Sequence, residues 1–107
     1  MRLDPPLTEF YKSASVMVLR YHGNQTQILS VSRRDDHSDI TLPGGKLDDG
    51  ETFLDGALRE LFEETGLRVH HQYLMPIFQD FHTNHKKPGV GYWCQVFRTY
   101  EDFSRCE

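Results

Sequence analysis

The sequence predicts a mixed α/β or α+β domain in which one helix packs against a sheet. An amphipathic helical pattern runs through residues 52–66, and apolar, β-branched segments lie on both sides of it. The chain has 107 residues, of which 37% are hydrophobic and 12% aromatic, and this is enough to form the core of one domain. We therefore expect residues 1–107 to form a single domain.

Two strands are expected before the helix. Residues 13–21 (SASVMVLRY) and 27–32 (QILSVS) are apolar and β-branched, and the turn-forming residues 22–24 separate them, which predicts a hairpin. The pieces that follow are expected to be a polar loop at residues 33–39, an extended piece at 40–42, a strand end at 43–45 (Pro-Gly-Gly) and a loop at 46–51.

The helix has recognisable start and stop signals. Thr52 is a suitable N-cap, and Asp55 three residues later nearly completes a capping box. Gly66 suits the left-handed position that ends many helices, and Phe62 and Leu67 are placed to touch in a Schellman closure. The apolar stripe of the helix consists of Leu54, Ala57, Leu58 and Leu61.

Further strands are expected after the helix. Residues 69–81 predict one long strand or two short strands broken near Pro76, and the sequence 86–89 (Lys-Lys-Pro-Gly) predicts a turn. Residues 90–100 (VGYWCQVFRTY) are apolar on both faces, which is typical of a central strand.

Charge and composition exclude several classes of protein. The net charge is −4, and no basic run is longer than a pair, so a surface that follows a nucleic-acid polymer is not expected. Two cysteines are too few for a disulfide framework. The N-terminal residues do not resemble a signal peptide, and no apolar run is long enough to cross a bilayer. We expect a cytoplasmic domain without membrane contact.

Three glutamates lie close together on the helix. Glu60, Glu63 and Glu64 project from one side at positions i, i+3 and i+4, and Glu51 stands at the helix entrance. Such like charges repel, and no lysine separates them between residues 52 and 66. The carboxylates either face solvent, which is the common arrangement on amphipathic helices, or surround a cation.

The spacing of these residues resembles the Nudix box. Gly45, Glu51 and the segment 59–67 (RELFEETGL) fit the pattern glycine, five residues, glutamate, seven residues, then Arg-Glu-apolar-any-Glu-Glu-any-Gly-apolar. The flanking sequence, particularly SVSRRDDHSDITLPGGKLDDGET, is similar to that of MutT-like members of the Nudix hydrolase superfamily.

The resemblance implies roles for particular residues. Glu63 and Glu64 would be ligands of Mg²⁺, which Mn²⁺ can replace, and Glu60 would be a third ligand or the general base. Arg59 would orient Glu60 or Glu63, and Gly44 would offer its carbonyl oxygen to the metal. The remaining candidates are Glu51 as a supporting or structural residue, Lys46, Arg33 and Arg34 as phosphate contacts, and Glu107 as an additional acid. Strand aromatics are more often core residues, but Tyr21, Phe81, Tyr92 and Trp93 are candidates for stacking on a base.

The resemblance also implies a fold and an activity. Nudix proteins have a mixed sheet between helices, and no segment after residue 100 is long enough for the second helix, so we expect the domain to be incomplete at its C-terminus. The implied activity is Mg²⁺-dependent cleavage of a diphosphate linkage, in which a nucleoside triphosphate, oxidised or not, gives a monophosphate and pyrophosphate. The alternatives are hydrolysis of ADP-ribose, nucleotide sugars or dinucleoside polyphosphates, and a non-catalytic module that senses a nucleotide. The expected partner is a small-molecule nucleotide, and the sequence allows a homo-oligomer.

Overall fold

The computed structural model describes residues 7–32, 40–83 and 87–101. The expected loop at residues 33–39 and the candidate residues Arg33, Arg34 and Glu107 lie outside these ranges. The described elements are β1 (Glu9–His22), β2 (Gln25–Ile28), β3 (Val31–Ser32), β4 (Ile40–Thr41), β5 (Gly44–Lys46), α1 (Phe53–Thr65), the 3₁₀ turn η1 (His71–Tyr73), β6 (Met75–Thr83) and β7 (Val90–Tyr100).

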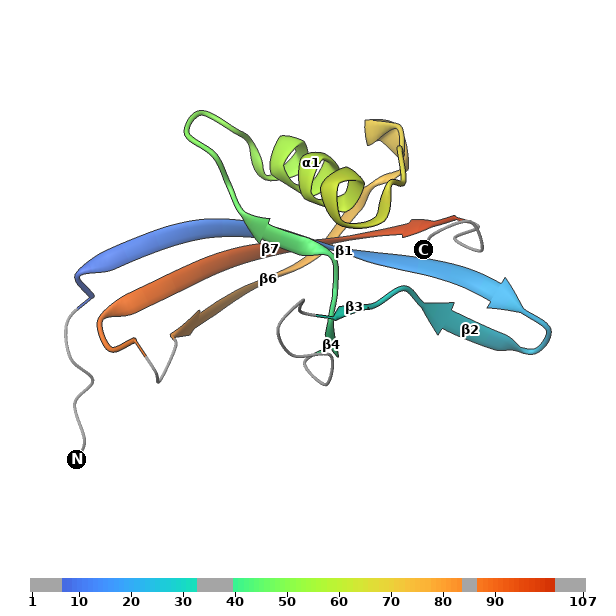
Figure 1. The fold of residues 1–107 in the computed structure, drawn as a ribbon, viewed down its shortest axis with the longest axis horizontal. Helices are drawn as coiled ribbons and strands as arrows, with labels where there is room; N and C mark the ends of the chain where they lie inside the picture. The colour runs from blue at the N-terminus through green and yellow to red at the C-terminus, as the bar shows by residue number, and fades with distance from the viewer. Residues whose placement is uncertain (1–6, 33–39, 84–86, 102–107) are drawn as a thin grey trace.

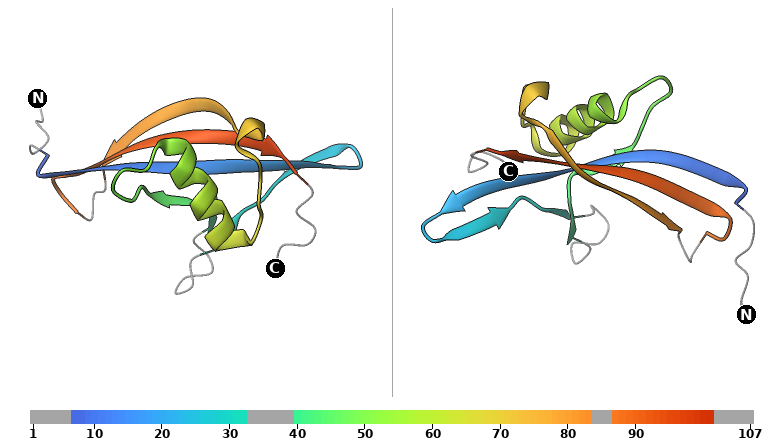
Figure 2. Two further views of the ribbon diagram at one scale, coloured as in Figure 1. Left: turned by 90° about the horizontal axis from the view of Figure 1, so that it is seen from above. Right: turned by 180° about the vertical axis from the view of Figure 1, so that it is seen from behind.

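The main sheet is mixed and has five strands (Figure 1). Its order is β2-β1-β7-β6, and β5 pairs with β1 outside this path. The two long central strands, β1 and β7, pair in parallel from Glu9↔Val90 to Leu19↔Tyr100, whereas β2, β5 and β6 are antiparallel to their partners. The short strands β3 and β4 form a separate pair on the side of the sheet away from α1 (Figures 1 and 2). The predicted mixed α+β architecture is confirmed.

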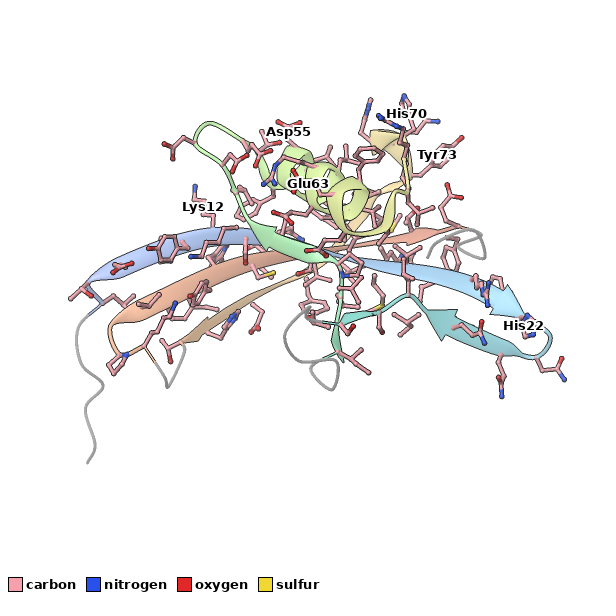
Figure 3. The ribbon with its side chains drawn as sticks, in the orientation of Figure 1. Lys12, His22, Asp55, Glu63, His70 and Tyr73 are labelled. Atoms are coloured by element: carbon pink, nitrogen blue, oxygen red, sulfur yellow. The ribbon has the colours of Figure 1, made fainter. Side chains whose placement is uncertain are left out.

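The core lies between α1 and one face of β1 and β7. Ala14, Val16 and Val18 alternate along β1 toward the helix and are fully buried, as are Ala57 and Leu61 of the predicted apolar stripe. Phe97 completes the cluster from β7, and Leu54 and Leu58 pack at its margin. Lys12 rises from β1 on the same side, and its Nζ lies 5.9 Å from the centre of the Phe53 ring (Figure 3).

The caps of α1 follow local sequence signals. The Thr52 hydroxyl accepts a hydrogen bond from the Asp55 N–H, and the Asp55 carboxylate accepts one from the Thr52 N–H, so the capping box is complete. Gly66 has a φ of 78°, and its N–H donates to the carbonyl of Phe62. This single bond is an αL closure, and the expected Schellman closure is therefore wrong. The N–H of Leu67 donates instead to the Thr65 hydroxyl.

The hairpin is confirmed, but two predictions before the helix need correction. The expected strand at 27–32 is divided into β2 and β3, because β3 pairs with β4 and not with β1. The glycine pair was expected to end a strand, and residue 46 to begin a loop. Gly44–Lys46 instead form β5, whose partners are Ser13, Ala14 and Ser15 of β1.

The predictions after the helix are confirmed in most respects. The strand at 90–100 is β7, and it lies between β1 and β6 as expected of a central strand. The expected strand at 69–81 starts later, at Met75, because η1 occupies His71–Tyr73. Its register is irregular between Pro76 and Phe78, close to the predicted break. Within the described ranges α1 is the only α-helix, and no helix there is long and apolar enough to cross a membrane.

Candidate active site

Arg59 is the centre of the acidic cluster. Its Nε donates to Glu51 Oε2 at 2.8 Å and its Nη2 donates to Glu51 Oε1 at 3.0 Å, which makes a bidentate pair. Glu51 Oε1 also accepts the Asp48 N–H at 2.7 Å. The Arg59 hydrogen bond and then the Asp48 N–H hold the pKa of Glu51 below its usual range. Arg59 thus fixes the loop before the helix against the helix itself.

The same guanidinium reaches the helix glutamates and β5. Its Nη1 donates to Glu60 Oε1 at 2.9 Å and to Glu63 Oε2 at 3.2 Å, and its Nη2 donates to the Lys46 carbonyl at 3.0 Å. The side chain of Glu60 is 16% exposed and that of Glu63 is 55% exposed. We predicted that Arg59 would orient Glu60 or Glu63, and in the structure it contacts both.

Glu64 is held by a different group. Its Oε2 accepts the N–H of Gly44 at 3.1 Å, which joins the helix to the edge strand β5. Burial raises the pKa of Glu64 to about 6; the Gly44 N–H opposes this rise, whereas the carboxyl groups of Glu60 and Glu63 add to it. Glu64 is still exposed to solvent, so it is a partly desolvated carboxyl group among like charges, and a nearby cation would favour its ionised form.

The two glycines of β5 allow close approaches that a side chain would prevent. A Cβ added to Gly44 would lie 2.4 Å from the Ala14 carbonyl oxygen and 2.8 Å from Ser15 Cα. A Cβ added to Gly45 would lie 2.7 Å from both Cδ and Oε1 of Glu60. Gly44 thus permits the packing of β5 on β1, and Gly45 leaves the space that the Glu60 carboxylate occupies.

These different neighbours predict different effects for two alanine substitutions. Gly44→Ala meets rigid backbone, and we expect it to lower the free energy of unfolding by about 1–3 kcal/mol, as overpacking usually does. Gly45→Ala meets the end of a flexible side chain, so it should cost less stability but displace the Glu60 carboxylate. Chemical denaturation of both variants checks this difference. A Gly45→Ala protein that is as destabilised as Gly44→Ala would contradict it.

The predicted site residues within the described ranges fall into one connected group, with one exception. Arg59 contacts Glu51, Glu60 and Glu63, and Gly44 contacts Glu64. The two sets adjoin where the carboxyl groups of Glu60 and Glu64 meet. Lys46 joins the group through its backbone carbonyl only, because its side chain lies over the Tyr11 ring, with Nζ 4.1 Å from the ring centre. Sequence reasoning missed Asp48, whose Oδ2 lies 3.2 Å from Arg59 Nε. The available signal for it was an acidic residue in the loop between Gly45 and Glu51 of the box.

The oxygen donors of this group suit a hard divalent cation. Mg²⁺ takes carboxylate and carbonyl oxygens, and Glu60, Glu63, Glu64 and the backbone of Gly44 supply these. Across residues 7–32, 40–83 and 87–101, no three or more His, Cys, Asp or Glu side chains are gathered into a metal-binding group. Glu60 and Glu63 face the Arg59 guanidinium in this arrangement. The donor types fit the metal, and Arg59 supplies the positive charge among them.

Comparison with known proteins places this arrangement in context. The family model described as NUDIX domain matches residues 11–104. The fold is similar to that of a MutT/nudix family protein from Enterococcus faecalis, with a TM-score of 0.74 and 20% identity, covering 92% of this chain and 39% of that one. It is also similar to the NUDIX domain of Shewanella oneidensis NrtR complexed with ADP ribose (TM-score 0.70, 20% identity, 98% of this chain and 66% of that one).

A third similar structure is the Ap4A hydrolase of C. elegans. Its TM-score is 0.64 at 21% identity, and the match covers 87% of this chain and 70% of that one. At these identities the structural likeness establishes the fold alone. This chain spans well under half of the Enterococcus protein and about two thirds of the other two.

Proposed function

Since this chain belongs to the Nudix hydrolase superfamily, we propose that it is a divalent-metal-dependent pyrophosphohydrolase acting on a nucleoside diphosphate joined to another group. One observation carries the proposal. The Arg59 guanidinium and the Gly44 N–H bring the carboxylates of Glu51, Glu60 and Glu64 to the junction of α1 and β5. A purely solvated charged face would not need this degree of organisation.

The residues of the junction have separate tasks in the proposed reaction. Glu60, with its carboxylate partly shielded from water, would take the proton of the attacking water at one of its carboxylate oxygens. Arg59 would hold Glu60 in place, and its bidentate pair with Glu51 would keep the guanidinium from rotating. The β5 backbone would fix the distance between the helix and the substrate.

Glu63 and Glu64, with the carbonyl of Gly44, are the proposed metal ligands. A bound Mg²⁺ would neutralise charge on the diphosphate and align it for attack by water. Of the two helix glutamates that contact Arg59, Glu63 is the more exposed, so a metal ion can reach it. A bound metal would replace Arg59 as the cation beside Glu63, so the charge of Glu63 would stay balanced.

We propose a nucleoside triphosphate, oxidised or not, as the substrate, with a nucleoside monophosphate and pyrophosphate as products. The test is a panel of NTPs, dNTPs, 8-oxo-dGTP, ADP-ribose, nucleotide sugars and Ap4A with Mg²⁺, in which products are identified by chromatography. Release of pyrophosphate and a monophosphate from a triphosphate supports the proposal. Cleavage confined to ADP-ribose, a nucleotide sugar or Ap4A would assign the alternative substrate class. Binding of a nucleotide without any cleavage would identify a sensing module.

Metal binding has a consequence for stability. A cation that binds only the folded chain raises its melting temperature by linkage, so millimolar Mg²⁺ or Mn²⁺ should stabilise the wild-type protein. Glu64→Gln removes a ligand charge and keeps the side-chain size, and we expect it to abolish most of this rise. Thermal melts with and without metal measure the effect. A wild-type melting temperature that is indifferent to both ions would count against the site.

A further inference from the structure

A pocket lined by two tyrosines and two lysines lies on the face of the sheet opposite to α1 and the acidic cluster. It has a volume of about 390 Å³, and Tyr11 and Tyr92 line it together with Lys46, Lys87 and Glu9. Tyr11 lies on the face of β1 opposite to α1, because the side chains of Ala14, Val16 and Val18 alternate toward the helix. Tyr92 pairs with Tyr11 in the parallel register of β1 and β7, so both rings stand on this face.

The rings form a short row across three strands. The centres of the Tyr11 and Tyr92 rings are 5.8 Å apart, and the His82 ring of β6 lies 5.3 Å beyond Tyr92. At the other end of the row the Lys46 Nζ lies over the Tyr11 ring, 4.1 Å from its centre. One face of the half-buried Tyr11 ring therefore carries the ammonium group of the exposed Lys46 side chain, which a flat aromatic ligand can replace.

Strand β5 connects this pocket to the acidic cluster. Gly44 contacts Glu64, Gly45 lies against Glu60, and the Lys46 carbonyl accepts from Arg59, while the Lys46 side chain reaches Tyr11. Two residues of extended strand span about 7 Å. Among the described strands β5 pairs only with β1, and the side chains of α1 bind its other edge at the Gly44 N–H and the Lys46 carbonyl. A ligand in the pocket would therefore lie next to the residues that hold the acidic cluster.

We propose that this pocket holds the nucleobase and an adjoining phosphate of the substrate, with the base on Tyr11 and the phosphate on Lys46. The proposal rests on the proposed function, because it extends the same site. Any of the bases can stack on an aromatic side chain, because each has a flat π face. An ammonium group released from the Tyr11 ring can pair with a phosphate. The Tyr11 hydroxyl donates a hydrogen bond to Glu9, so the negative charge of Glu9 lies at the hydroxyl end of the ring. This charge repels the phosphate and favours its binding at Lys46.

A second stacked tyrosine pair in the chain provides a control for Tyr11. Tyr21 and Tyr100 form a second stacked pair on the same two strands, with ring centres 5.4 Å apart beside a pocket of about 380 Å³. Among the described residues that line that pocket there is no lysine, and its Arg20 donates to Gln27. It lies at the opposite ends of β1 and β7, far along the sheet from β5. A Tyr21→Leu variant therefore changes an exposed stacked tyrosine without changing the proposed site.

Calorimetric titration of the full chain tests the proposal with AMP, GMP, CMP and UMP as probes, and with ribose 5-phosphate as the probe that lacks a base. Tyr11→Leu should weaken binding of the four monophosphates about tenfold or more and leave ribose 5-phosphate unchanged. Lys46→Gln should weaken all five several-fold. Tyr11→Phe, which keeps the ring, and Tyr21→Leu should bind as the wild type does. Lys46 is exposed, so its variant tests the site even if Tyr11→Leu does not fold.

Three results would overturn the inference: no binding of any monophosphate to the wild type, unchanged binding by Tyr11→Leu, or equal losses in Tyr11→Leu and Tyr21→Leu. Hydrolysis is measured separately on the same proteins. If Tyr11→Leu loses affinity and the wild type cleaves no substrate, the pocket is a nucleotide-binding site and the proposed hydrolytic activity is rejected. Unchanged affinity with an active wild type would retain the activity and reject the pocket.

Discussion

Glu60→Gln is expected to lower kcat by a hundredfold or more and to change KM much less. The substitution keeps the size of the side chain and removes the charge that takes a proton or holds a metal, and a positioned acid–base group typically contributes this factor. Arg59 Nη1 now donates to Glu60 Oε1 at 2.9 Å, and a glutamine oxygen can accept the same bond. The variant should therefore fold normally, and steady-state kinetics on a panel substrate measure the effect.

The control for this experiment is Asp80→Asn, which removes one negative charge from β6 beside His82. Its turnover should equal that of the wild type, since Asp80 makes no contact with the acidic cluster among the described residues. Equal turnover by Glu60→Gln and the wild type would remove Glu60 from the mechanism.

Arg59→Met should lower both stability and turnover. The guanidinium partners Glu51 and Glu60, whose side chains are 17% and 16% exposed, so its loss leaves two shielded carboxylates without a cation. We expect the free energy of unfolding to fall by about 2 kcal/mol and kcat to fall at least tenfold. Arg59→Lys should restore little of either, because a single ammonium cannot reproduce the bidentate contact with Glu51 and also reach Glu60.

A double-mutant cycle separates the pair from its surroundings. Glu51→Gln with Arg59→Met should destabilise less than the sum of the two single variants, because Glu51 then carries no charge that the lost guanidinium would have to balance. Glu60 loses its cation in both proteins that lack Arg59, so its contribution cancels from the cycle. Urea denaturation gives the four free energies. An Arg59→Met protein with the same midpoint and slope as the wild type would show that the network contributes nothing to folding.

Local signals explain why the helix could be predicted. Thr52, Asp55 and Gly66 act on backbone groups within a few residues, and the stripe containing Ala57 and Leu61 depends only on helical spacing. Strand β7 was predicted for a similar reason, because its apolar character on both faces is visible in the strand itself.

The errors lie where partners are distant in sequence. Gly44 and Gly45 have low strand propensity, and only their pairing with Ser15 and Ala14, about thirty residues earlier, makes them a strand. The Arg59–Glu51 pair depends on how the loop before the helix folds back. Helical spacing therefore indicated Glu63 but could not indicate Glu51 as a bidentate partner.

The aromatic pocket shows the same limit. Tyr92 was among the predicted stacking residues, but Tyr11 was not. Their pairing depends on the parallel register of two strands that lie some eighty residues apart in the chain. Tyr21, another of the predicted candidates, belongs to the second stacked pair at the other end of the sheet.

The central claim is that the acidic cluster is the site of metal-dependent hydrolysis. Its most direct test measures hydrolysis of the substrate panel by one preparation of the folded chain, first with Mg²⁺, then with excess EDTA, and then with Mg²⁺ restored. We predict cleavage of at least one diphosphate linkage with Mg²⁺, its loss in EDTA and its return when the metal is restored. Cleavage that persists in EDTA, or a folded chain that cleaves no member of the panel with Mg²⁺, would contradict the claim.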